Sequence, residues 1–294
     1  GPPGAMLCDR GFDMAGRCVI WLVVLAVWTG CARAGGEADE PPLEQSVCGL
    51  QEPVMFWLWS GLAGSPDAAR VRGLPNVEDI AFDTRDGRVL RGYRLRARRS
   101  DKPPSAAQGC LLVMQGNAML ADRILGEFTG FADAGLDVYV YDYRGYGRSG
   151  GSRRLKAMVS DYAEISNALR DAGCARRFVY AMSFGGIVYL DGLALHDGAD
   201  RVVIDSTPAR LSDYGCPQAY DPVNHLPADC GDFLLIAGEK DGVVTSSMSR
   251  DLLEQAQQCG ATVRREADFA HPFMDRDRAV HRRRLELIEA YLLR

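Results

Sequence analysis

The sequence predicts an α/β protein in which a mostly parallel, twisted sheet carries helices on both faces. Continuous apolar runs that suit buried strands alternate with segments of helical spacing along most of the chain. Strand–helix–strand units of this kind build parallel sheets through right-handed crossovers. With 294 residues, of which 47% are hydrophobic and 25% charged, the chain is long enough to bury a sizeable core.

Each element follows from its local pattern. Two alternating segments around a turn predict a β-hairpin over 77–84 and 88–97. Later apolar runs predict strands at 109–116, 136–145, 176–183, 201–207, 233–241 and 261–268. Helical spacing predicts helices at 119–135, 155–173, 185–198, 245–260 and 282–293. Ligands of such sheets bind at the carboxyl ends of the strands, where we expect functional residues.

The first part of the chain has the composition of an export signal. Residues 18–30 form an apolar run of about 13 residues, which is short for a membrane-spanning helix of about 20 but suits a signal-peptide core. Cys31 follows this run as in a bacterial lipoprotein processing site, where the cysteine is acylated. We therefore expect a leader over 1–35, with 1–13 as upstream or added sequence, and a lipid-anchored protein that faces the periplasm. Cleavage without lipidation and a retained anchor stay open.

Residues 36–76 are expected to form an N-terminal extension before the main domain. Within it, residues 54–64 are apolar and rich in aromatic side chains. This stretch either packs on the core or lies at a membrane surface or a pocket rim, and the sequence leaves both open.

The charge of the chain argues against a nucleic-acid partner. The net charge is -5, whereas phosphate binding requires clustered Lys and Arg. The basic runs at 94–99 and 282–284 are expected to be solvated faces. No group of Cys and His has the spacing of a zinc site, and we expect neither a metal nor an organic cofactor.

Cysteine usage is consistent with an oxidising compartment. The chain has nine cysteines, which is many for a reducing cytosol. Cys216 and Cys230 flank a Pro-rich segment, and closing a loop of about 15 residues is worth about 3 kcal/mol in the chain-entropy model. We expect these two cysteines to form a disulfide, with two buried thiols as the alternative.

Ser183 lies where an apolar strand becomes a helix, which is the position of a nucleophile at a sharp turn. Such a turn packs helix against strand so closely that the residues two before and two after the serine must be small. Here these residues are Ala181 and Gly185, and Gly186 follows. The alternative is a structural serine in a turn of small residues.

A serine nucleophile needs a base, and the base needs an acid that orients it. Of the four histidines, His271 alone follows a predicted strand at its carboxyl end. Asp241 ends another buried strand at the same edge and is the expected acid, with Asp205 as the competitor. The oxyanion of an acyl transfer would be stabilised by the backbone N–H of Phe184 and, after the 109–116 strand, by that of Asn117.

These motifs together resemble the α/β-hydrolase superfamily, in particular the subgroup with an H-G-N-A oxyanion loop. The corresponding stretches read QGNA at 115–118, DYRGYGRSGG at 142–151 and AMSFGG at 181–186, followed by Asp241 and His271. Gln115 replaces the histidine and Ala181 the first glycine of that pattern. The resemblance covers 77–294, the expected catalytic domain.

The resemblance implies a serine hydrolase that cleaves small carboxylic esters or thioesters through an acyl-enzyme, without a cofactor. Only residues 208–232 separate the two strands between which a lid is inserted, so we expect a minimal lid and an open pocket. The alternatives are a serine peptidase of the same fold, or a catalytically silent lipoprotein that uses the fold as a binding or envelope scaffold.

Overall fold

The computed structural model of the chain describes residues 42–98, 107–174 and 176–294, which belong to one structural unit starting at Pro41. The leader predicted over 1–35, including Cys31, lies outside the described residues. Of the helices that are described, none has both the length and the apolar character required to cross a bilayer.

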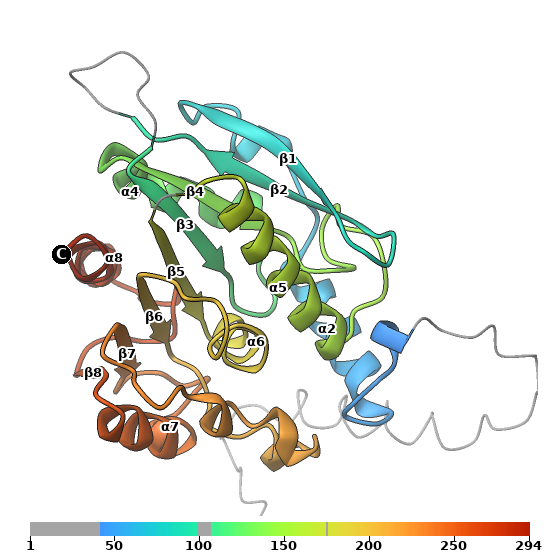
Figure 1. The fold of residues 1–294 in the computed structure, drawn as a ribbon, viewed down its shortest axis with the longest axis vertical. Coiled ribbons are helices and arrows are strands. Elements are labelled where there is room, and N and C mark those ends of the chain that lie inside the picture. Colours follow the sequence, from blue (N-terminus) through green and yellow to red (C-terminus); the bar gives the residue numbers. More distant parts are fainter. Residues whose placement is uncertain (1–41, 99–106, 175) are drawn as a thin grey trace, which may run out of the picture. The chain divides into compact units, whose positions relative to one another are not determined.

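A mostly parallel sheet forms the centre of the described chain (Figure 1). Its eight strands lie in the order β1-β2-β4-β3-β5-β6-β7-β8. β1 and β2 form the predicted antiparallel hairpin, β2 is also antiparallel to β4, and all later neighbours are parallel. The strands are β1 (Val77–Asp83), β2 (Val89–Leu95), β3 (Gly109–Met114), β4 (Leu136–Tyr141), β5 (Arg177–Met182), β6 (Arg201–Asp205), β7 (Phe233–Gly238) and β8 (Thr262–Glu266). The predicted fold class is confirmed.

Side chains that alternate along the strands build one core on each face of the sheet. On one face Leu112 and Val179 pack against α5 (Leu155–Asp171), α6 (Phe184–Gly192) and α7 (Ser246–Gln258). On the other face Leu111 and Phe178 pack against α3 (Ala121–Ile124), η4 (Leu125–Phe128), α4 (Thr129–Asp133) and α8 (Arg278–Leu292). A sheet that is covered on both faces leaves its strand ends as the place for a site.

Two predicted helices differ from the observed ones. The helix expected over 119–135 is divided into α3, η4 and α4, and it contains Gly126 and Gly130, which are poor helix formers. The helix expected over 185–198 ends at Gly192, where a Cβ atom would lie 3.0 Å from the carbonyl oxygen of Val159 on α5. α6 therefore stops where it approaches the neighbouring helix.

The segment between β6 and β7 contains no α-helix. It forms three short 3-10 helices, η5 (Ser212–Tyr214), η6 (Gln218–Tyr220) and η7 (Pro222–His225). Such a segment fits the expectation of a minimal lid, because single turns do not build a helical cover.

α2 (Gln51–Ala63), which precedes the sheet in the sequence, lies beside the start of α6 and the segment after β6. The ring of Phe56 lies 5.4 Å from that of Phe184, the first residue of α6. Gln51 Nε2 donates a hydrogen bond to the carbonyl oxygen of Tyr214 in the segment after β6. In the apolar stretch 54–64, Phe56 therefore packs on the core, whereas Trp57 is exposed.

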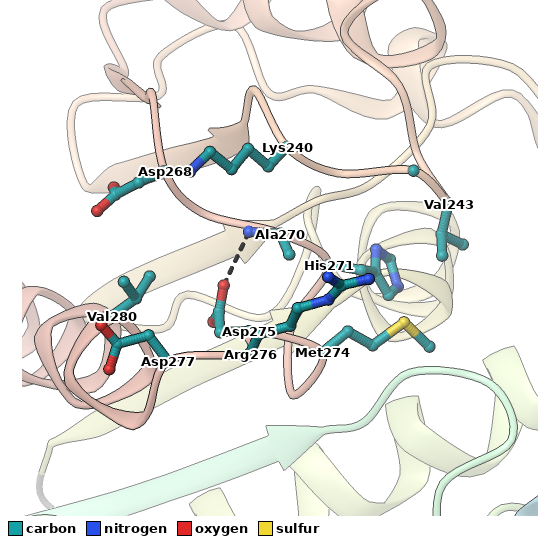
Figure 2. A pocket seen from close by; sticks show the side chains of 11 residues that line it. Lys240, Val243, Asp268, Ala270, His271, Met274, Asp275, Arg276, Asp277 and Val280 are labelled. Atoms are coloured by element: carbon teal, nitrogen blue, oxygen red, sulfur yellow. Dashed lines mark hydrogen bonds between the residues drawn. The ribbon is translucent and has the colours of Figure 1, made fainter.

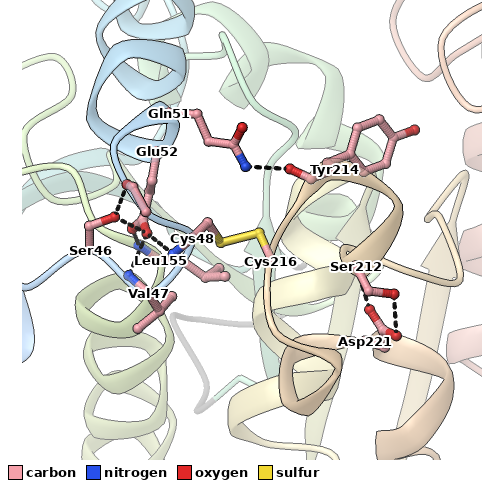
Figure 3. Close-up of a disulfide and its surroundings, with 11 residues drawn as sticks. Ser46, Val47, Cys48, Gln51, Glu52, Leu155, Ser212, Tyr214, Cys216 and Asp221 are labelled. Carbon is pink, nitrogen blue, oxygen red and sulfur yellow. Dashed lines mark hydrogen bonds between the residues drawn. A yellow bond between two sulfur atoms is a disulfide. The ribbon is translucent and has the colours of Figure 1, made fainter.

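The predicted disulfide between Cys216 and Cys230 is wrong. Cys216 is bonded to Cys48, which precedes α2 (Figure 3). Cys230 is bonded to Cys259 at the end of α7. A third disulfide joins Cys110 and Cys174. Loop-closure entropy favours pairs that are close in sequence, but here the fold positions each cysteine beside a more distant partner.

Candidate active site

Ser183 occupies a strained turn between β5 and α6. Its φ and ψ are 52° and −115°, a conformation that side-chain-bearing residues rarely adopt. Its backbone N–H donates to the carbonyl oxygen of Asp205, 2.7 Å away. The side chain is partly exposed, and its hydroxyl has no hydrogen-bond partner among the described residues.

Gly185 and Gly186 permit this turn because they have no side chain. Neighbouring atoms occupy the space that a side chain would need at either position. A Cβ atom on Gly185 would lie 2.0 Å from the carbonyl oxygen of Met114 at the end of β3. A Cβ atom on Gly186 would lie 2.0 Å from Thr207 Oγ1 after β6. α6 therefore begins in direct contact with the ends of the strands on both sides of β5, as a nucleophile elbow requires.

The loop after β3 lies beside Ser183. A Cβ atom on Gly116 would be 3.5 Å from Cβ of Ser183. Asn117 Oδ1 accepts hydrogen bonds from Tyr146 Oη (2.5 Å) and from the N–H of Ala118 (3.0 Å). In the described part of the chain, the backbone N–H groups of Asn117 and Phe184 donate no hydrogen bond.

Gln115, which replaces the histidine of the H-G-N-A pattern, is fully buried and supports this loop. Its Nε2 donates to the carbonyl oxygen of Tyr141 on β4 at 2.7 Å. The main-chain carbonyl oxygen of Gln115 accepts a hydrogen bond from Tyr143 Oη at 2.6 Å. The Gln115 side chain thus ties the loop to the neighbouring strand and takes no part in the open surface.

Asp241 and His271 meet at the same edge of the sheet. Asp241 follows β7, His271 follows β8, and Asp241 Oδ2 lies 2.8 Å from His271 Nδ1. The other carboxylate oxygen accepts from the N–H groups of Val243 and Val244, each at 2.8 Å. Burial disfavours the charge of Asp241, but the bonds from His271 and from the two N–H groups outweigh it and lower the pKa of this carboxyl.

The pairing determines which nitrogen of His271 is available. An ionised carboxylate can only accept, so Nδ1 carries the proton and Nε2 is left free to accept one. The structure brings Asp241 and His271 into contact. Ser183 lies at the end of β5, which is separated from β7 by one strand, β6. No hydrogen bond joins Ser183 to His271 here, and such catalytic bonds are often long before substrate binds.

Comparisons with known proteins bear on the fold. A family model described as serine aminopeptidase, S33, matches residues 105–228. The esterase Pf2001 of Pyrococcus furiosus has a similar structure, with a TM-score of 0.57 and 18% identity over 74% of this chain and 91% of that chain. The chain has the α/β-hydrolase fold.

Two relatives illustrate how far the sequence similarity extends. The uncharacterised protein YfhR of Escherichia coli (strain K12) is 25% identical over 199 residues, which are 62% of this chain and 69% of YfhR. A monoacylglycerol lipase of Mycolicibacterium smegmatis is 34% identical over 113 residues, or 36% of this chain and 40% of the lipase.

Asp205, the competing acid, has a different partner. It ends β6 and is fully buried. Its carboxylate accepts from Tyr180 Oη at 3.0 Å, from Ser206 Oγ at 3.1 Å and from Arg284 of α8 at 3.1 Å. Asp205 therefore forms an ion pair with an arginine and makes no contact with His271.

Arg284 contradicts the expectation of a solvated basic face at 282–284, because it is fully buried. Besides Asp205, it donates to the carbonyl oxygen of Ala270 at 2.5 Å, and its Nε lies 3.4 Å from Asp275. Asp275 in turn accepts from the N–H of Ala270 at 2.8 Å. Arg284 thus connects Asp205 at the end of β6, whose carbonyl oxygen accepts from the Ser183 N–H, to the loop that carries His271. No local pattern in the sequence indicates this role.

The remaining histidines lie elsewhere. His196 is exposed in the turn after α6. His225 Nε2 lies 2.8 Å from the carbonyl oxygen of Ala219, within the segment after β6. His281 on α8 lies 3.4 Å from Glu127. His271 is therefore the histidine that the fold presents between the ends of β7 and β8.

A cavity of about 550 Å³ adjoins His271 on the side of α8 (Figure 2). Val243 and Met274 contribute exposed apolar side chains to it, and Lys240 and Arg276 contribute cations. Among the described residues that could chelate a metal, no group of three or more His, Cys, Asp or Glu has a suitable arrangement.

Proposed function

We propose that this α/β-hydrolase cleaves carboxylic esters or thioesters through an acyl-enzyme formed on Ser183. The observation that carries the proposal is the hydrogen-bonded pair of Asp241 and His271 at the sheet edge that also holds the Ser183 turn. A free hydroxyl, an imidazole with an open nitrogen and a buried carboxylate are the three groups that this chemistry needs.

In the first step, Ser183 Oγ attacks the acyl carbon while His271 Nε2 accepts the hydroxyl proton. Asp241 keeps the imidazole in the required tautomer and stabilises the imidazolium that forms. The imidazolium then gives its proton to the departing alcohol or thiol. In the second step, water loses a proton to His271 and attacks the acyl-enzyme. The imidazolium then returns the proton to Ser183 Oγ as the bond to the acyl carbon breaks, which releases the acid.

The tetrahedral intermediate of each step carries a negative oxygen. We assign its stabilisation to the backbone N–H groups of Asn117 and Phe184, which have no other acceptor in the described chain and flank Ser183. Loss of one such donor typically slows a reaction about 100- to 1,000-fold. Because backbone groups provide these bonds, side-chain substitution of Asn117 alone would leave them in place.

Esters and thioesters are favoured over amides by the leaving group. Alcohols and thiols depart more readily than amines, and we find no feature that marks an amine-binding site. The names of the M. smegmatis lipase and the P. furiosus esterase support the same choice. The matched family model is described as a serine aminopeptidase, which makes peptide hydrolysis the second candidate.

The place of action is also a proposal. We propose that the chain is exported and held at the cell envelope through an acyl group on Cys31, since this residue directly follows the apolar run 18–30. Replacing Cys31 with serine should release the protein from the membrane fraction of cells. Retention of the Cys31→Ser protein in that fraction to the same extent would exclude the acyl anchor.

The function is tested with p-nitrophenyl esters of increasing chain length, a thioester and an aminoacyl p-nitroanilide. We expect hydrolysis of the esters and the thioester, with an initial burst of p-nitrophenol if deacylation is slow. Ser183→Ala should be inactive on all of them. Activity on the anilide alone would favour the peptidase, and no activity on any substrate would favour a silent scaffold.

A further inference from the structure

The outward side of α2 is an apolar surface without a partner in the described chain. Its members are the six side chains of Leu50, Val54, Met55, Trp57, Leu58 and Leu62, which we call the outer face of α2, and all are exposed. Five of them recur at the spacing i, i+4, i+7, i+8 and i+12, which places them on one stripe of the helix. The opposite stripe, with Glu52, Phe56 and Ala63, is buried.

α2 is mostly apolar on its outer side as well as on its inner side, although only the inner side is buried. Helices of this kind normally lie inside a core or in a membrane, whereas water-exposed helices carry charges on their outer side. The one charged residue of α2 is Glu52, and it points inward. Its carboxylate accepts from the N–H groups of Val47, Cys48 and Leu155. The outer face of α2 therefore contains no charge at all.

Exposed apolar side chains are concentrated at the edge of the sheet that holds the candidate site. Besides the outer face of α2, large exposed apolar side chains in the described residues are Tyr214 after β6, Val243 after β7, Met274 after β8, and Leu195. Only Leu195 lies at the opposite edge, beyond the end of α6. A concentration of this kind marks an interaction surface rather than random exposure.

α2 is held too firmly to hide its outer face by turning inward. A disulfide joins Cys48 to Cys216, and Gln51 is bonded to Tyr214, at the start of the helix (Figure 3). Towards its end, Ser60 Oγ accepts from Arg153 at 2.5 Å. The apolar surface is thus part of the folded molecule and needs an external partner.

We propose that the outer face of α2 docks on a lipid surface, so that the candidate active site faces the membrane. A lipid surface fits because an uncharged face of Trp, Leu, Val and Met can enter the boundary between the headgroups and the acyl chains. The order of segments in the sequence supports the choice of a lipid surface. The apolar run 18–30 and Cys31 precede α2, and the stretch from Cys31 to Pro42 spans at most about 40 Å when fully extended.

A membrane anchor at or before Cys31 would therefore keep α2 close to the bilayer and raise its effective concentration there. The docking of α2 on a lipid surface does not depend on the proposed function. Access of membrane-borne esters to Ser183 rests on the proposed function as well.

The first experiment uses the tryptophans of the full chain as reporters. Trp21→Phe and Trp28→Phe remove the two in the apolar run, and a third substitution leaves either Trp57 or Trp59. Trp57 is exposed, whereas Trp59 is partly buried against Phe56, with ring centroids 5.8 Å apart. The two single-tryptophan proteins are therefore a matched pair on one helix.

Each protein is mixed with phosphatidylethanolamine–phosphatidylglycerol vesicles whose acyl chains carry bromine. We expect the emission of Trp57 to shift to the blue and to be mostly quenched, and that of Trp59 to change much less. A Trp57 that stays water-exposed on vesicle-bound protein would overturn the proposal. So would a blue-shifted Trp57 before lipid is added, because the leader or a second copy of the chain would then cover the face.

The second experiment links docking to substrate access. Trp57→Gln with Leu62→Gln should lower the ratio of hydrolysis of a vesicle-embedded ester to that of a soluble ester by about tenfold or more. Leu195→Gln, an exposed apolar residue at the opposite edge, should leave the ratio unchanged. An equal effect of both changes would overturn the docking of α2. If no ester is hydrolysed by any variant, the proposed function fails, while the fluorescence result still decides the docking.

Discussion

Two aspartates at neighbouring strand ends have opposite surroundings. Asp205 ends β6 and is bonded to Arg284, Tyr180 and Ser206 in a fully buried cluster. Asp241 follows β7 and is bonded to His271, which borders an open cavity. Both carboxylates are buried and partnered, so burial alone does not distinguish their roles.

The difference lies in the partner. Arginine keeps its proton at every pH at which the protein folds, so the pair of Asp205 and Arg284 can only connect elements. Histidine exchanges a proton near neutral pH, so the pair of Asp241 and His271 can support chemistry. Asp191 on α6 extends the comparison, since both oxygens of its buried carboxylate lack a hydrogen-bond partner. The same side chain thus occurs bonded to a permanent cation, bonded to a titratable base, and without a hydrogen-bond partner.

The largest effect is expected for Asp241→Asn. The amide keeps the shape of the carboxylate but favours the wrong tautomer of His271, so kcat should fall about 10⁴-fold with the fold retained. Steady-state kinetics on a p-nitrophenyl ester measure the rate, and circular dichroism checks the fold. A loss of less than tenfold in folded protein would mean that Asp241 does not serve as the acid.

Arg284→Met should reduce stability more than chemistry. Removing one partner of a buried ion pair leaves Asp205 uncompensated and typically costs about 3–5 kcal/mol of unfolding free energy. The loop of His271 also loses the bond from Arg284 to Ala270, so kcat should decrease while KM changes little. Denaturant unfolding and kinetics measure both effects, and Arg284→Lys should restore part of each. An unchanged kcat in Arg284→Met would show that the bond does not position His271.

Asp205→Asn is the matched control for Asp241→Asn. It keeps the shape of the side chain but weakens the bonds to Arg284, so unfolding free energy should fall by about 2–3 kcal/mol. Because Asp205 does not touch His271, kcat below the melting temperature should stay within about tenfold of the wild type. A loss near 10⁴-fold would instead assign the role of the acid to Asp205.

The smallest effect is expected for Asp191→Asn, and it depends on pH. Burial, and then repulsion from Asp221, raises the pKa of Asp191 to about 8. The native state therefore retains a proton that the unfolded chain releases above about pH 4, and stability falls as the pH rises from about 4 to 8. Asparagine removes this dependence.

Thermal unfolding of wild type and Asp191→Asn at pH 5 and pH 8 measures this difference. The two proteins should be nearly equally stable at pH 5, and the variant should be more stable at pH 8 by about 1–2 kcal/mol. Equal differences at both pH values would mean that Asp191 is charged in the native state. The cation of His225, whose Nε2 lies 3.7 Å from Asp191, would be the reason.

The sequence predicts the strand ends well because their periodicity is local. Once a parallel sheet is expected, residues that follow different strands must meet at one edge, which places Ser183, Asp241 and His271 there. The role of Arg284 could not be predicted in this way. In sequence it stands in a run of three arginines, and only the distant Asp205 and Asp275 make its burial favourable.

The disulfides and α2 show the same limit. The pairing of Cys48 with Cys216 joins segments 168 residues apart, and no local pattern indicates that α2 lies beside the segment after β6. The apolar stretch over 54–64 is evident in the sequence, but only the fold shows which of its side chains face outward.

The most direct test of the central claim is labelling with a fluorophosphonate, followed by peptide mass spectrometry. The account predicts a single adduct on Ser183 in the wild type, with little or no adduct in Ser183→Ala and in folded His271→Ala. Equal labelling of wild type and Ser183→Ala, or an adduct on another residue, would contradict it.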